Sequence, residues 1–153
     1  MAGLLAVPGS SDPNLQVLEN PYQSDPRLTR LQQFFQQKGS PAHAMAEDFL
    51  VASDKHNLDW RLLPSISFLE SGGGKEYRNN NILGWDSCRQ NFPTIRDGIH
   101  AVASRLANSK LYKDKDLDAI LATYNPYNDY ASKVKMIMRA LGPETFPPEA
   151  TLN

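Results

Sequence analysis

The residue of this sequence best suited to chemistry is Glu70. It follows a stripe of apolar residues that should form a buried helix, and it precedes three consecutive glycines at residues 72–74. A carboxyl group at the edge of a hydrophobic core loses hydration, which raises its pKa and favours the neutral acid. Such an acid can protonate a glycosidic oxygen near pH 7, and the glycines leave room for a bulky polymer. The alternative is an ordinary surface glutamate at a helix end, next to a flexible loop.

Three segments carry motifs in a fixed order. Residues 70–75 read Glu-Ser-Gly-Gly-Gly-Lys, and residues 80–85 read Asn-Asn-Ile-Leu-Gly-Trp. The third segment has the pattern Tyr-x5-Tyr-Ala-x-Lys-Val at residues 124–134. Together they resemble the bacterial glucosaminidase-type peptidoglycan hydrolases, which are related to the lytic transglycosylases and goose-type lysozymes. The resemblance covers residues 42–141, including the stretch 49–69 that leads into the glutamate.

This resemblance implies an all-α, lysozyme-like domain with a glycan cleft, and with a small β-hairpin or an irregular loop beside the active site. Glu70 would act as the acid and base of that cleft, and the Tyr124 hydroxyl would point into the cleft near Glu70 as a second catalytic group. The residues that would bind the substrate are Ser71, Gly72, Asn80, Asn81, Trp85 and Tyr130.

The same residue types also have structural explanations. Tyr124 can be a core aromatic on its helix, and Tyr130 is suited to packing. Asn80 and Asn81 are common turn residues that hold loops in place. Trp85 can stack on a sugar ring through its apolar face, or it can anchor the loop as a half-buried side chain.

Departures from the family pattern bear on which bond is cut. Leu83 stands where the family usually has an aromatic residue, and the loop 74–80 is short, which would alter the cleft wall. Transglycosylases carry Gly-Leu-Met-Gln where this chain has Ile-Leu-Gly-Trp at residues 82–85, which favours an endo-N-acetylglucosaminidase. The pair Tyr124-Asn125, however, resembles the transglycosylase Tyr-Asn motif. The alternatives are a lytic transglycosylase, a muramidase, or a non-catalytic cell-wall-binding module in a secretion or phage-like assembly.

No second acid stands out beside Glu70. Asp86 and Glu76 lie in the loop after the glycines, where a carboxylate is usually just solvated. We therefore expect a single glutamate to protonate the leaving oxygen and then to act as base. The substrate's own N-acetyl carbonyl or Tyr124 would support the oxocarbenium-like state. Capture by water would give a hydrolysed product, and capture by the sugar's 6-hydroxyl an anhydro product.

Composition and spacing argue against several other classes of protein. Sixteen Lys and Arg against seventeen Asp and Glu give a formal charge of −1, which disfavours nucleic-acid binding. No apolar run approaches the ~20 residues of a membrane span. His43 and Glu47 share a helix face but lack a third metal ligand, and Gly74-Lys75 fails the phosphate-binding pattern. A single cysteine, Cys88, rules out an intrachain disulfide, and we expect neither a metal nor a cofactor.

Hydrophobic periodicity predicts a series of helices that position these residues. The first expected helix begins near Pro26, the second covers residues 42–55, and the third runs from an Asp59 cap to Glu70. The fourth begins at a Thr94 cap, the fifth begins at an Asp116 cap, and the last covers residues 130–141. Between the third and the fourth, residues 72–93 should form an irregular excursion that carries much of the candidate site.

One domain with two extensions accounts for the length of the chain. We expect a flexible N-terminal arm at residues 1–23, a lysozyme-like glucosaminidase domain at 24–142 and a Pro-rich tail at 143–153. The apolar stretch at residues 3–7 is too short for an export signal and no basic residue precedes it. With peptidoglycan glycan strands as its partner, the protein is expected to be a periplasmic or secreted monomer whose export signal is not in this sequence.

Overall fold

The computed structural model describes residues 19–147 of the 153-residue chain. Its α-helices are α1 (Pro26–Gln37), α2 (Ala46–Lys55), α3 (Leu62–Ser71), α4 (Ile95–Asn108), α5 (Leu117–Tyr124) and α6 (Tyr130–Leu141). A short 3-10 helix, η1 (Pro41–Met45), and a short turn with left-handed residues, η2 (Trp85–Cys88), are added. No strand is formed within residues 19–147, so the all-α prediction is confirmed and the region beside the site is an irregular loop rather than a hairpin. None of the helices in this range has the length and apolar character needed to cross a membrane.

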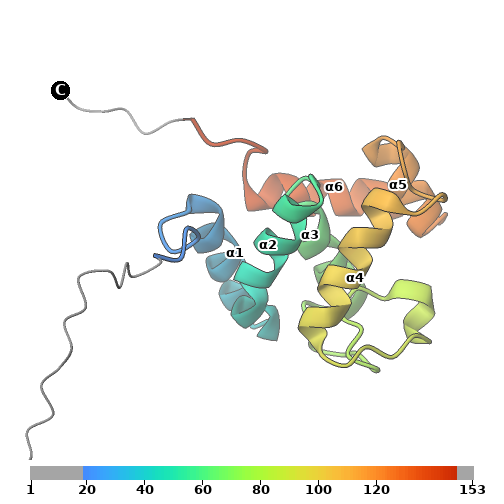
Figure 1. The fold of residues 1–153 in the computed structure, drawn as a ribbon, viewed down its shortest axis with the longest axis horizontal. Coiled ribbons are helices and arrows are strands. Elements are labelled where there is room, and N and C mark those ends of the chain that lie inside the picture. Colours follow the sequence, from blue (N-terminus) through green and yellow to red (C-terminus); the bar gives the residue numbers. More distant parts are fainter. Residues whose placement is uncertain (1–18, 148–153) are drawn as a thin grey trace, which may run out of the picture.

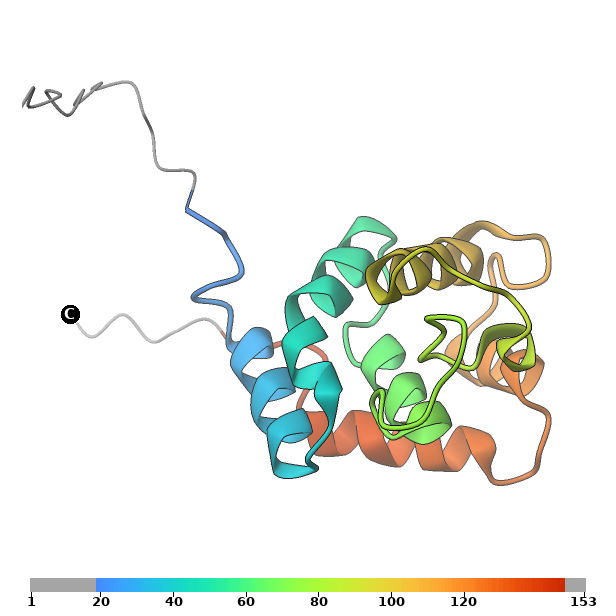
Figure 2. The same cartoon turned by 90° about the horizontal axis from the view of Figure 1, so that it is seen from below.

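Helix α3 is the centre of the fold. It packs against α2 and α6, while α1 and α4 pack on α2, and α5 packs on α6 (Figures 1 and 2). Residues 62–67 of α3 are all buried, and Leu63 and Ile66 are 0 % exposed. Only the C-terminal turn of α3 becomes accessible, and Glu70 is its exposed residue. The core therefore fixes the helix and leaves its last turn for function.

Several predicted helix starts are confirmed by their local chemistry. Pro26 occupies the first turn of α1, where its missing N–H costs no hydrogen bond. The Thr94 side chain accepts a hydrogen bond from the N–H of Asp97 at the start of α4. The Asp116 side chain accepts one from the N–H of Ala119 at the start of α5. Each cap satisfies a backbone donor that the first turn of a helix leaves free.

Two other starts differ from the prediction. The predicted helix over residues 42–55 is divided, because its first part forms η1 and α2 begins only at Ala46. Helix α3 begins at Leu62 rather than next to Asp59, whose side chain accepts from the N–H of Arg61 (3.0 Å) in the preceding turn. Apolar spacing locates a helix but does not separate a 3-10 turn from an α-turn at its end.

Both ends of the described chain are attached to the helices. The Tyr22 hydroxyl donates a hydrogen bond to Asp54 on α2 (3.0 Å). The Trp60 indole N–H donates to the carbonyl of Glu144 (2.9 Å). In both views these ends lie near α1, on the opposite side of the molecule from α5 (Figures 1 and 2). Of the predicted arm and tail, residues 1–18 and 148–153 lie outside the described residues.

Candidate active site

The end of α3 places Glu70. Gly72 adopts a left-handed conformation (φ +64°), and its N–H donates to the carbonyl of Phe68 (2.9 Å). Gly73 then passes so close to Phe35 that a Cβ atom at this position would lie 2.9 Å from the ring. Glycine suits the left-handed conformation at position 72 and leaves room for the Phe35 ring at position 73. The glycine run noted in the sequence therefore ends the helix immediately after Glu70 and its neighbour.

Ser71 and Gly72, which we expected to bind substrate, belong to this turn instead. Ser71 is 6 % exposed, and its hydroxyl oxygen lies 2.7 Å from the carbonyl oxygen of Ile82 and accepts from the N–H of Gly74 (2.9 Å). Neither Ser71 nor Gly72 lines a cavity beside Glu70. The polar atoms of Ser71 connect the turn to the following loop, so the structure gives Ser71 and Gly72 a structural role, and their contact with substrate stays a prediction.

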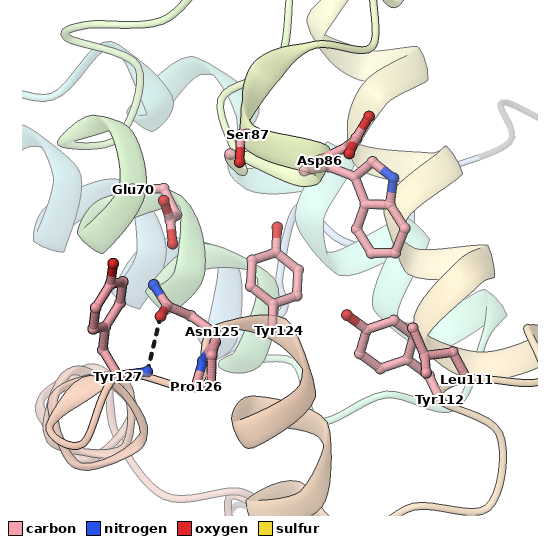
Figure 3. Close-up of a pocket in the computed structure, with 11 residues that line it drawn as sticks. Glu70, Asp86, Ser87, Leu111, Tyr112, Tyr124, Asn125, Pro126 and Tyr127 are labelled. Carbon is pink, nitrogen blue, oxygen red and sulfur yellow. Dashed lines mark hydrogen bonds between the residues drawn. The ribbon is translucent and has the colours of Figure 1, made fainter.

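A cavity of about 470 Å³ opens beside Glu70 (Figure 3). We call residues 79–92 the wall loop, since part of this loop forms one side of the cavity. The lining comes from Glu70 on α3, residues 84–87 of the wall loop, Leu111 and Tyr112 before α5, and residues 124–127 at the end of α5. A volume of this size is typical of ligand-binding sites. The structure thus brings the predicted acid together with aromatic and amide side chains from a distant part of the chain.

Glu70 also borders a second cavity, of about 250 Å³. Asn125 and Tyr127 line both cavities, whereas Tyr130 and Lys133 line only the smaller one. Glu70 therefore lies where two hollows meet. A surface that is hollowed on both sides of an acid can accept an extended chain across it.

The Glu70 carboxyl is surrounded by protein atoms, although its side chain remains exposed to solvent through the cavity. Partial burial raises the pKa of Glu70 above its ordinary value, and the Tyr130 hydroxyl beside it lowers that pKa by a smaller amount. The net direction is the one expected from the sequence. The exposure is greater than expected, because Glu70 lies at an open groove rather than at a closed edge of the core.

Gly84 of the wall loop lies directly against Glu70. A Cβ atom at position 84 would be 2.6 Å from Oε2 of Glu70 and 2.9 Å from its Cδ. Gly84 also has a left-handed backbone (φ +66°). The close contact requires glycine and the backbone conformation favours it, so the wall loop approaches the carboxyl more closely than a residue with a Cβ atom would allow.

Tyr124 and Tyr130 stack beside the carboxyl, with ring centroids 6.2 Å apart and planes inclined by 7°. The Tyr124 hydroxyl donates a hydrogen bond to the carbonyl of Leu83, next to Gly84 in the wall loop. Burial raises the pKa of Tyr124 well above its ordinary value, so the phenol stays neutral. Tyr124, expected as a catalytic residue, lines the cavity with its ring while its hydroxyl proton is committed to the backbone.

Tyr130 is 5 % exposed, and its hydroxyl makes no well-formed hydrogen bond within residues 19–147. Burial raises the pKa of Tyr130, and so does the nearby charge of the Glu70 carboxylate. A buried hydroxyl without a regular partner is uncommon in folded proteins. Because little of Tyr130 is exposed, its position favours an effect on the pKa of Glu70 over the direct contact with substrate that we expected.

Tyr130→Phe is expected to move the alkaline limb of the pH–activity profile to higher pH. The hydroxyl lowers the pKa of Glu70, so its removal raises that pKa further and keeps the acid protonated over a wider range. A reaction in which Glu70 is the acid uses its protonated form, so the rate of such a reaction should fall at a higher pH in the variant than in the wild type. The measurement is kcat/KM against pH, with Tyr77→Phe as the control, since Tyr77 is 46 % exposed and lines neither cavity. A limb that stays in place or moves to lower pH contradicts the assignment of Tyr130.

Asn80 and Asn81 hold the wall loop together. Asn81 is 1 % exposed, accepts a hydrogen bond from the N–H of Trp85 (3.0 Å) and donates to the Trp85 carbonyl (2.8 Å). Asn80 donates to the carbonyl of Phe92 (2.9 Å). Neither lines a cavity beside Glu70, which favours the loop-holding alternative, and their contact with substrate stays a prediction.

Trp85 is both an anchor and part of the lining. The Arg105 guanidinium of α4 lies over its ring at 5.3 Å from the centroid. The rings of Tyr112 and Tyr124 contact it at centroid distances of 5.7 and 5.8 Å. Trp85 is half-buried and still lines the larger cavity. It therefore offers a fixed apolar surface to a ligand.

The wall loop passes over the cavity through consecutive residues in the left-handed conformation. Asp86, Ser87 and Cys88 have φ values of +49°, +52° and +59°. This conformation costs an L-residue on the order of 1–2 kcal/mol, and only single residues usually adopt it. The segment 86–88 is therefore a strained part of the loop, at the edge of the cavity.

The two loop acids considered as partners of Glu70 do not face it. Asp86 lines the larger cavity, but it forms an ion pair with Arg89, and Figure 3 shows its carboxylate directed away from Glu70. Glu76 is exposed and lines neither cavity. Glu70 is thus the one carboxyl at the junction of the two cavities among the described residues.

Several lining residues were not identified from the sequence, namely Ser87, Leu111, Tyr112 and Tyr127. Leu111 and Tyr127 are 58 % and 78 % exposed, which is unusual for large apolar side chains, but this signal exists only in three dimensions. Asn125 was noted only for its neighbour Tyr124. Its Oδ1 accepts from the N–H of Tyr127 (3.1 Å), and Figure 3 shows its amide nitrogen directed into the cavity toward Glu70.

Comparison of the chain with protein-family models, with curated proteins and with solved structures found no match. No cluster of His, Cys, Asp and Glu within residues 19–147 is arranged to hold a metal ion.

Proposed function

We propose that this protein cleaves the glycan strands of bacterial peptidoglycan, with Glu70 as the general acid and then the general base. One observation carries the proposal: a carboxyl with a raised pKa lies at the junction of two cavities. A hollow on both sides of the acid suits a bond inside a polymer. The resemblance of the motifs at residues 70–75, 80–85 and 124–134 to those of glucosaminidase-type hydrolases suggests the polymer, and a lysozyme-like arrangement of the helices is part of the same proposal.

The chemistry requires two proton transfers, and both pass through Glu70. Neutral Glu70 donates its proton to the glycosidic oxygen as the bond to the anomeric carbon breaks. The resulting Glu70 carboxylate then accepts a proton from the oxygen nucleophile that attacks the anomeric carbon. The Tyr130 hydroxyl lowers the pKa of Glu70, which means that it stabilises the carboxylate formed between these steps. A raised pKa serves the donating role, and the Tyr130 hydroxyl favours the carboxylate that accepts the second proton.

A mechanism with a single protein carboxyl fits the surroundings of Glu70. Asp86 is paired with Arg89 and turned away. Asp129 lines the smaller cavity, but its pKa is lowered by a hydrogen bond from Lys133 and it is held in that ion pair at 2.8 Å. Since no carboxylate of residues 19–147 faces Glu70, the N-acetyl carbonyl of the substrate is the group that supports the positive charge at the anomeric carbon. Glycosidases of this substrate-assisted kind are an established exception to the two-carboxylate rule.

Sugar binding is assigned to the lining of the larger cavity. Trp85 and Tyr112 offer apolar ring surface, and Leu111 extends it at the rim. The amide N–H groups of Asn125 are available for a sugar hydroxyl or an acetamido carbonyl. Tyr124 is assigned a positioning role, because its hydroxyl fixes Leu83 and the glycine against Glu70.

The preferred bond is that of an endo-N-acetylglucosaminidase, on the grounds of the sequence at residues 82–85. Lytic transglycosylase and muramidase activity are the alternatives, because both use the same acid in the same kind of groove. A substrate in the bacterial wall places the site of action in the periplasm or outside the cell.

The experiment is incubation with purified sacculi, followed by mass spectrometry of the soluble fragments. N-acetylglucosamine at the new reducing ends supports the proposal, muramic acid there indicates a muramidase, and anhydro ends indicate transglycosylation. Binding to sacculi without release of muropeptides contradicts catalysis and favours the cell-wall-binding module. Absence of both binding and release contradicts the proposed substrate.

A further inference from the structure

The strained segment of the wall loop brings one polar side chain toward Glu70. Of its three residues, Asp86 is paired with Arg89 and points away from Glu70, and Cys88 does not line the cavity. Ser87 is exposed and lines the cavity. In the view of Figure 3 it lies between Glu70 and Asp86, at the part of the wall loop nearer to Glu70. Its hydroxyl has no hydrogen-bond partner within residues 19–147.

The strained conformation is held by fixed side chains around it. Asn79 donates a hydrogen bond to the carbonyl of Cys88 (2.8 Å), at the end of the strained segment. At its beginning, Asn81 holds both the N–H and the carbonyl of Trp85. A left-handed backbone at three L-residues persists only if its surroundings enforce it, and such strain concentrates at sites that bind or react. The loop is thus built to keep position 87 where it is.

We propose that Ser87 is a substrate-positioning residue, whose hydroxyl hydrogen-bonds a polar group of the sugar held next to Glu70. This inference rests on the proposed function. A hydroxyl both donates and accepts, which matches the hydroxyl and acetamido groups of a glycan. The wall loop then contributes two things to the site. Gly84 leaves room for the carboxyl because it has no side chain, and Ser87 holds the sugar that the carboxyl protonates.

The experiment compares variants that separate the hydroxyl from the backbone strain. Ser87→Ala removes the hydroxyl and keeps the strain, so KM for soluble glycan strands should rise about 3- to 10-fold at nearly constant kcat, as for one lost hydrogen bond. Ser87→Gly removes both, so KM should rise equally while Tm increases by about 2–5 °C. Ser87→Asn keeps a polar side chain that tolerates the left-handed region, and KM should stay within about twofold of the wild type.

The matched control is Cys88→Gly, because Cys88 shares the left-handed backbone (φ +59°) and lines neither cavity. Its Tm should rise with KM unchanged. Provided that the wild type cleaves glycan strands, either of two results overturns the inference. One is an equal rise of KM in Cys88→Gly, and the other is an unchanged KM in both Ser87→Ala and Ser87→Gly. An unchanged or lowered Tm in Ser87→Gly overturns the claim that strain is retained for this position. A wild type that neither cleaves nor binds glycan strands overturns the proposed function and this inference together.

Discussion

Glu70→Gln is expected to lower the rate of glycan-strand cleavage by about 10³-fold or more, because the amide has no acidic proton to donate and cannot act as base afterwards. Glutamine has nearly the same shape, and Glu70 is exposed at the groove, so folding should be little affected. The free energy of unfolding is expected to change by less than about 0.5 kcal/mol, as for most surface substitutions. The measurements are the initial rate of soluble muropeptide release and thermal unfolding of both proteins.

The matched control for this substitution is Glu76→Gln. Glu76 is an exposed carboxylate of the following loop and lines neither cavity, so the same chemical change there should leave the rate at the wild-type level. A Glu70→Gln protein with undiminished wall-lysing activity would refute the assignment of the acid. An equal loss in the Glu76→Gln protein would indicate an effect of overall charge on the binding of sacculi.

Gly84→Ala is the second change with a large expected effect. The added Cβ atom would lie 2.6 Å from Oε2 of Glu70, so either the carboxyl or the wall loop must move. A displacement of this size at the reacting group is expected to lower kcat/KM by about 10²-fold. The left-handed backbone of Gly84 adds strain of about 1 kcal/mol, which appears as a lower Tm.

Gly39→Ala separates these two contributions. Gly39 has nearly the same backbone conformation (φ +63°), but a Cβ atom there would meet nothing within 4 Å. Its alanine variant should therefore lose stability to a similar extent and keep the activity of the wild type. Full activity in Gly84→Ala would show that the contact with Glu70 is not needed. Equal losses of activity in both variants would attribute the effect to unfolding alone.

The helices were predictable because each carries a signal in its own sequence. Thr94 and Asp116 are capping residues followed by apolar positions at helical spacing, and both caps are formed. Apolar residues at helical spacing before Glu70 predicted a buried α3, in which Leu63 and Ile66 are 0 % exposed. The division of residues 41–55 into η1 and α2 was not predictable, because 3-10 and α turns share their apolar spacing.

The candidate site was predictable only where its signals are adjacent in the sequence. Glu70 stands between an apolar helix and a glycine turn, and that local pattern is sufficient to single it out. The role of Asn81 was not decided by its type, since an asparagine that holds a loop and one that faces a ligand look the same in a sequence. The wall loop depends on distant contacts, such as Arg105 of α4 over the ring of Trp85. Leu111 joins the cavity only through the fold of the whole chain.

The two ends of the described chain lie on the side of the molecule away from α5 and the larger cavity (Figures 1 and 2). A bead, a fusion partner or a solid support attached at either end would therefore not obstruct the groove at Glu70. An insoluble mesh such as the bacterial wall cannot diffuse to an enzyme, so the enzyme must present its groove to the mesh. Attachment next to residue 19 or residue 147 should preserve that presentation.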